Sequence, residues 1–185
     1  MKKPVRSDTK LKLTLAHAVI FVLALQATQA YAQRLSLSGG SGTDGDIYQL
    51  SLITHSGFWT HETSGGLKIQ AHLESTLTQI DGSGAGGNKG ITVVGLTPTL
   101  TLSTPKSPVY AEFGIGAHYF DQKEINSRKS VGTHFEFGDF LGVGVRLGAR
   151  DQFELGYRVI HFSNAGMSSN NPGLDFHQIR FGLTF

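Results

Sequence analysis

The sequence lacks cysteine altogether and has few prolines, 5 in 185 residues. Without cysteine, neither a disulfide framework nor a thiolate metal site can form. None of the 8 histidines lies in an HExxH motif or a comparable ligand spacing, so the sequence predicts no metal and no other cofactor. An apolar run long enough for a transmembrane helix is also missing, because Leu13–Leu25 spans 13 residues where about 20 are needed.

The first 32 residues have the layout of a secretory signal peptide. Basic residues precede the run Leu13–Leu25, and the small residues Ala30 and Ala32 follow it. We therefore predict a signal peptide over residues 1–32, cut after Ala32, rather than a membrane anchor, and an exported domain over residues 33–185. The signal holds 5 of the 16 basic and 1 of the 14 acidic residues, which leaves 11 basic and 13 acidic ones. The exported domain is slightly acidic, and nothing in its charge indicates a nucleic-acid partner.

Apolar and polar residues alternate along the exported domain with period two, the pattern of strands with two different faces. The clearest case is residues 153–163, where Phe153, Leu155, Tyr157 and Val159 share one face. No long segment shows a helical period. We predict eight strands, at about residues 34–38, 47–54, 67–78, 94–103, 109–119, 135–147, 153–163 and 176–185.

The two faces of these strands differ in a way that indicates a membrane barrel. The apolar faces hold no charge other than Asp139, whereas the opposite faces combine many glycines with charges of both signs. The charges are Glu112, Glu136, Glu154, Arg146, Arg158 and Arg180. Glycines and mixed charges suit a narrow barrel interior better than the wet face of a soluble sandwich. We predict an all-β fold, an eight-stranded antiparallel transmembrane β-barrel, with interior charges that pair with one another rather than forming a pore or a catalytic site.

The connections between strands differ in length, which orients the barrel. The turns "STPKSP" and "GARDQ" after the fourth and sixth strands are short, and "GGSGTDG", "IDGSGAGGNKG", "DQKEINSRKSVG" and "NAGMSSNNPG" after the odd strands are longer. Outer-membrane barrels have short periplasmic turns and longer outside loops. Both termini are therefore predicted to be periplasmic, although "HSGFWTHETSGG" after the second strand is long for a periplasmic turn.

His161, Ser163 and Asp175 form a polar group where apolar residues are expected. His161 and Ser163 continue the parity of the apolar face of their strand, and Asp175 has the parity of Ile179 and Phe181 in the next strand. All three are thus predicted on the outside of the barrel, near the cell exterior. Residues i and i+2 on a strand share a face about 7 Å apart, so an imidazole can approach the serine oxygen while a carboxylate on the neighbouring strand orients it.

The segments "HFSNAG" and "NPGLD", within residues 161–175, resemble the signature of the lipid A 3-O-deacylase (PagL) family. These proteins are eight-stranded outer-membrane barrels that hydrolyse the ester at position 3 of lipid A. The resemblance implies Ser163 as nucleophile, His161 as base, and Asn164 with neighbouring backbone amides such as Gly166 as oxyanion stabilisers. Asp175 takes the position of the acidic member, which is usually glutamate in the family.

The resulting hypothesis is an ester hydrolase in the bacterial outer membrane, crossing it several times, with its active site facing the outer leaflet. Its implied partners are lipopolysaccharide and the outer-membrane lipids, and a homodimer is left open. A second hypothesis is a non-enzymatic barrel with a structural or adhesive role, which the fold alone does not separate from the first. A metal-dependent, phospholipase-like barrel is disfavoured because its ligand spacing is missing.

Overall fold

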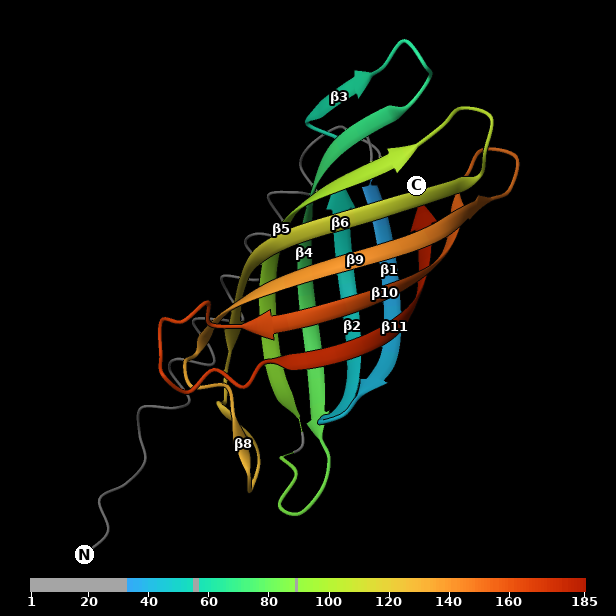
Figure 1. Ribbon diagram of the computed structural model, residues 1–185. Helices are drawn as coiled ribbons and strands as arrows, with labels where there is room; N and C mark the ends of the chain where they lie inside the picture. The colour runs from blue at the N-terminus through green and yellow to red at the C-terminus, as the bar shows by residue number, and fades with distance from the viewer. Residues whose placement is uncertain (1–32, 55–56, 89) are drawn as a thin grey trace, which may run out of the picture. The chain divides into compact units, whose positions relative to one another are not determined.

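The computed structural model describes residues 33–54, 57–88 and 90–185. The regular structure in these ranges consists of strands (Figure 1). They are β1 (Gln33–Gly42), β2 (Gly45–Thr54), β3 (Trp59–Glu62), β4 (Lys68–Gly82), β5 (Ile91–Ser103), β6 (Val109–Phe120), β7 (Glu124–Asn126), β8 (Lys129–Ser130), β9 (Phe135–Leu147), β10 (Phe153–Ser163) and β11 (Leu174–Thr184). A helix able to span a membrane is not found in these ranges. The predicted signal peptide, residues 1–32, lies outside them.

Eight long strands close into a barrel, as Figure 1 shows. Closure is made by β1, which pairs antiparallel with β2 on one side and with β11 on the other. The remaining pairs are β2–β4, β4–β5, β5–β6, β6–β9, β9–β10 and β10–β11, all antiparallel. The predicted all-β, eight-stranded antiparallel barrel is confirmed. A closed barrel has no free edge strand, and every strand can satisfy its backbone groups within the sheet, as a bilayer requires.

The barrel strands present an apolar outside. Their inside is polar around the buried charges and apolar toward the end where β10 finishes and β11 begins, where a buried cluster includes Ile47, Phe120, Ile160, Phe162 and Phe176. In β10, Phe153, Leu155, Tyr157 and Val159 are exposed, and the residues between them are buried. The same alternation runs through β6, β9 and β11. Apolar side chains that remain exposed over a whole belt suit contact with lipid rather than with water. The period-two pattern of the sequence thus predicted correctly which face of these strands points outward and which points into the barrel.

Five of the six interior charges that the sequence marked pair with an opposite charge inside the barrel, whereas the sixth, Glu136, accepts hydrogen bonds from Thr133 instead. Arg158 lies at the centre of the network: its Nη1 and Nη2 are 2.9 Å from the carboxylate oxygens of Glu74, and its Nε is 2.7 Å from Oε1 of Glu112. Arg180 Nη2 donates to the same Glu112 oxygen at 2.9 Å. These side chains are fully buried, so their mutual pairing offsets the cost of removing the charges from water.

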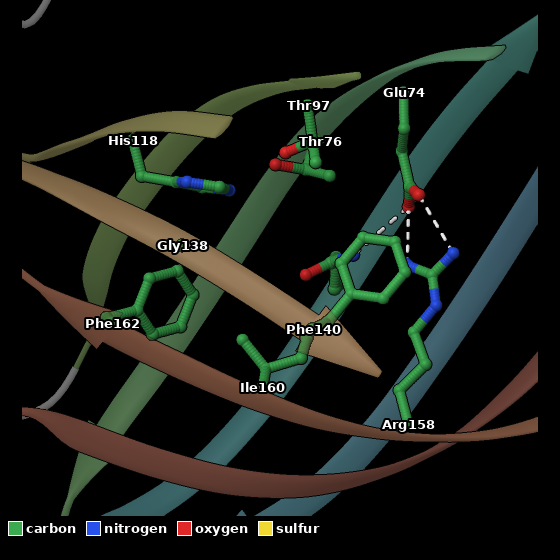
Figure 2. Close-up of a pocket in the computed structure, with 10 residues that line it drawn as sticks. Glu74, Thr76, Thr97, His118, Gly138, Phe140, Arg158, Ile160 and Phe162 are labelled. Atoms are coloured by element: carbon green, nitrogen blue, oxygen red, sulfur yellow. Dashed lines mark hydrogen bonds and ion pairs between the residues drawn. The ribbon is translucent and has the colours of Figure 1, made fainter. Parts of the chain in front are cut away.

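The barrel centre is filled rather than open. Figure 2 shows a cavity between the Arg158–Glu74 pair and the rings of His118 and Phe162. Its volume is about 10 Å³, which holds about one water molecule. The barrel interior is packed, with apolar side chains beside the paired charges, and this argues for the structural interpretation of its charges over a pore.

The barrel has a loop end and a turn end, which the connections define. Residues 104–108 and 148–152 form short connections at the turn end. Residues 83–88, 121–134 and 164–173 belong to the connections at the opposite, loop end. Residues 57–67 at the turn end include β3, which pairs with the start of β4. β7 and β8 form a small hairpin within the connection 121–134.

The first connection at the loop end is shorter than the sequence predicted. β1 continues to Gly42 and β2 begins at Gly45, so "GGSGTDG" contributes only a two-residue turn. Gly42 makes the extension feasible, because a Cβ at this position would lie 1.8 Å from the carbonyl oxygen of Asp175 in β11. The small residues that suggested a loop instead let three strands run close together at the rim.

Candidate active site

β10 carries two polar side chains on its outward face at the loop end. His161 and Ser163 are half-buried, and Ile160 and Phe162 between them point into the barrel and are buried. The alternation of β10 continues without a bulge through these positions, because each residue from Phe153 to Ser163 has its register partner on β9. The predicted outward placement of His161 and Ser163 agrees with this geometry.

Asp175 lies directly across from His161 on β11, and the two are register partners. His161 Nδ1 is 2.7 Å from Asp175 Oδ1. Since a carboxylate only accepts hydrogen bonds, Nδ1 carries the proton and donates, which leaves Nε2 as the basic nitrogen. The aspartate therefore reaches the imidazole although it is one methylene shorter than glutamate.

Ser163 lies two residues further along the same face, opposite Phe137 of β9. Its hydroxyl makes no hydrogen bond within the described ranges, so the structure brings together His161 and Asp175 but does not join Ser163 to them. The spacing of i and i+2 residues on a strand, about 7 Å between Cα atoms, leaves Ser163 within reach of a rotated imidazole. Hydrogen bonds of this kind are often long before substrate binds.

Asn164 is fully buried, and its side chain holds the connection 164–173 in shape. Its Nδ2 donates to the carbonyl oxygens of Asn170 at 2.9 Å and Val131 at 3.3 Å, while Oδ1 accepts from the backbone N–H of Gly166 at 3.1 Å. Both the amide of Asn164 and the N–H of Gly166 are therefore engaged in the loop. Their role as oxyanion donors stays a prediction.

A tight turn follows the serine. The N–H of Met167 donates to the carbonyl of Asn164 at 2.9 Å, and the two central residues, Ala165 and Gly166, have φ values of 50° and 81°. This is the pattern of a type I′ turn, which is uncommon for alanine at its first central position. The N–H of Ala165 makes no hydrogen bond to any described residue, and it is the unengaged amide nearest to Ser163 in the turn.

Two connections at the loop end support each other. Asn170 Nδ2 donates to the carbonyl of Ser130 at 3.1 Å, beside the bond from Asn164 to Val131. Gly132 lies so close that a Cβ there would be 2.1 Å from the carbonyl oxygen of Asn170. The segment after Ser163 is thus braced by residues more than thirty positions earlier in the chain, a contact that sequence reasoning did not find.

Gly173 packs against the imidazole of His161. A Cβ at position 173 would lie 2.6 Å from His161 Cε1, which is closer than real side chains approach. The φ of Gly173 is 66°, in the left-handed region that favours glycine. The position of the imidazole ring is therefore set by packing against Gly173 and by the hydrogen bond to Asp175. Both residues belong to the "NPGLD" segment.

Asp139 is a further acidic residue beside His161 that the sequence marked but did not explain. It is exposed on the outward face of β9, and it is the register partner of His161 on the side opposite Asp175. The signal was its charge on an otherwise apolar face. Its neighbour could not be known without the register between β9 and β10.

Metal ligands do not gather in the part of the chain that the structure describes: no three His, Cys, Asp or Glu side chains lie in a ligand arrangement there. The arrangement on β10 and β11 instead offers an imidazole oriented by a carboxylate, next to a hydroxyl. These are the parts of a serine esterase, with activation of the hydroxyl by the imidazole.

Known proteins similar to this chain are lipid A deacylases. The chain is 32% identical to the lipid A deacylase PagL of Bordetella bronchiseptica, over 90% of this chain and 93% of that protein. It is 25% identical to the lipid A deacylase PagL of Pseudomonas aeruginosa, over 94% and 99% of the two chains. A crystal structure of the outer membrane enzyme PagL has the same fold, with a TM-score of 0.69 and 19% identity over 81% of this chain and 98% of that one. The family model of lipid A 3-O-deacylase (PagL) matches residues 47–184. The chain therefore belongs to the lipid A 3-O-deacylase (PagL) family.

Proposed function

We propose that this protein hydrolyses the ester at position 3 of lipid A with Ser163 as nucleophile, His161 as general base and Asp175 as the residue that orients His161. The observation that carries this assignment is the 2.7 Å contact between His161 Nδ1 and Asp175 Oδ1 on the outward face of the barrel. Ser163 is the next outward residue of β10 after His161. Membership of the lipid A 3-O-deacylase family supplies the substrate class, lipopolysaccharide.

The steps follow from the protonation of the imidazole. His161 Nε2 takes the proton of Ser163 as the oxygen attacks the ester carbonyl, and Asp175 stabilises the imidazolium that forms. The imidazolium then protonates the departing oxygen of the sugar, and an acyl-enzyme remains. Water, activated by the same nitrogen, releases the 3-hydroxy fatty acid. The unengaged N–H of Ala165 is suited to stabilise the oxyanion once substrate is bound.

The proposed site faces the outer leaflet of the outer membrane. His161, Ser163 and Asp175 lie at the loop end on the lipid-facing surface, and the apolar belt of β9, β10 and β11 begins directly below them. An ester bond at the headgroup level can reach Ser163 from there while its acyl chain stays in the bilayer. Periplasmic termini and a signal peptide at residues 1–32 accord with this orientation. A homodimer stays a prediction.

The alternative, a barrel with a purely structural or adhesive role, gives no reason for a histidine–carboxylate pair on a lipid-facing surface. Polar residues there are costly, although less so near the interface. Membership of a family of deacylases also favours the enzyme.

The test is the variant Ser163→Ala assayed on purified lipid A in detergent, with product detected by mass spectrometry. Loss of roughly 10⁴-fold or more in rate is expected when the nucleophile of such a site is removed. Ser169→Ala is a matched control, since Ser169 is exposed in the same connection and is expected to leave the rate unchanged. Heat-dependent gel mobility reports whether each variant is folded. Wild-type turnover in folded Ser163→Ala would refute the assignment.

A further inference from the structure

The carboxylate of Asp139 lies where it does not stabilise the folded barrel. It is exposed on the outward face of β9, where its nearest outward neighbours along the strand are Phe135, Phe137, Leu141 and Val143. Its carboxylate has neither a hydrogen bond nor an ion pair with any residue in the described ranges. An unpaired carboxylate among lipid-facing side chains costs free energy unless something outside the chain pairs with it.

The register places this carboxylate next to the reacting groups. Asp139 is the Cα partner of His161, and Phe137, two positions before it, is the partner of Ser163. Side chains of directly opposed residues start about 4.5–5.5 Å apart, and diagonal neighbours such as Asp139 and Ser163 about 7–8 Å apart. A group of the substrate that is bonded to Ser163 can therefore reach the Asp139 carboxylate.

The course of the acyl chain leads past Asp139. With the ester carbonyl at Ser163, the chain must run from the rim toward the apolar belt, whose next outward residues are Leu141 on β9 and Val159 on β10. Successive outward residues of one strand are about 7 Å apart along this path. Carbon 3 of the acyl chain lies two bonds of about 1.5 Å beyond the carbonyl carbon, so its substituent falls between the levels of Ser163 and Asp139.

We propose that Asp139 accepts a hydrogen bond from the 3-hydroxyl of the scissile acyl chain and thereby makes the enzyme selective for 3-hydroxyacyl esters. This inference rests on the proposed function, because it takes the ester carbonyl to lie at Ser163. A hydroxyl at this depth loses its water on binding and needs an acceptor, and an ionised carboxylate is a strong acceptor with no donor of its own. The hydrogen bond between the 3-hydroxyl and the Asp139 carboxylate therefore offsets the desolvation cost of both groups.

The experiment compares two synthetic diacyl glucosamine substrates whose position-3 acyl chains differ only in the presence of the 3-hydroxyl. We expect the wild-type protein to favour the hydroxylated ester about 10- to 100-fold in kcat/KM, the size of a hydrogen bond to a charged group. Asp139→Leu removes the acceptor and should bring the ratio close to one, through a loss on the hydroxylated ester alone. Asp139→Asn keeps one weaker acceptor oxygen and should give an intermediate ratio.

Val143→Ala is the matched control, on the same face of β9 but two outward positions further from the rim, and it should keep the wild-type ratio. Two results would overturn the proposal. One is a wild-type protein without preference for the hydroxylated ester. The other is an equal loss on both esters in the folded Asp139 variants, which would make Asp139 a second support of His161. Failure of the proposed function is distinguished from these, because it shows as turnover of both esters by Ser163→Ala.

Discussion

Gly173→Ala perturbs the proposed base without touching a polar group. The added Cβ would lie 2.6 Å from His161 Cε1, whereas ordinary contacts begin at 3.4 Å, so the ring must move by about 0.8 Å. The hydrogen bond from His161 Nδ1 to Asp175 Oδ1 is 2.7 Å long. A displacement of that size away from Gly173 carries Nδ1 beyond the usual limit of about 3.2 Å.

The expected consequence is kinetic. Misplacement of a reacting group by about 1 Å costs on the order of 10²-fold in rate, so kcat should fall by about that factor. KM should change little, because the substrate does not contact position 173 in the proposed arrangement. The variant also adds backbone strain of about 1–2 kcal/mol, since φ at this position is 66°.

Gly84→Ala separates the two effects. Gly84 has a φ of 83° in another connection of the loop end, and no heavy atom lies within 4 Å of the Cβ it would acquire. It therefore adds similar backbone strain without displacing a ring. Both variants are assayed on lipid A in detergent after gel mobility has shown that they are folded. If Gly173→Ala retains the kcat of Gly84→Ala, the packing of Gly173 on the ring has no part in placing His161.

Three further predictions concern other contacts. Asp175→Asn should lower kcat clearly yet leave residual turnover, and Asp175→Glu should keep substantial activity; equal rates in Asp175→Asn and wild type would exclude the carboxylate from the reaction. Arg158→Ala leaves the buried carboxylates of Glu74 and Glu112 without their shared partner, and should lower the free energy of unfolding by about 3–5 kcal/mol, seen as a lower temperature of the gel-mobility change. Asn164→Ala removes the amide that braces the turn after Ser163, and should open residues 164–173 to limited proteolysis; an unchanged cleavage rate would contradict this.

The sequence by itself determined the faces of the strands. In β10 the apolar residues Phe153 to Val159 recur at every second position, and His161 and Ser163 keep that parity, so their outward direction could be predicted before any pairing was known. The reason is local: successive side chains of a strand point to opposite faces whatever its neighbours are. The same reasoning predicted the charged part of the interior and, from the contrast between the two faces of the strands, the barrel.

Only the tertiary structure decided which residues meet. Asp139 and Asp175 stand on either side of His161 because β9 and β11 pair with β10 in one particular register, which the closure of the whole barrel sets. The sequence also misjudged the connection after β1, where glycine permits close strand packing as readily as a loop. The structural role of Asn164 also depends on the tertiary structure, since its side-chain amide donates to the carbonyl of Val131 in a distant connection. Registers and contacts between loops join segments far apart in the chain, and no local period of the sequence records them.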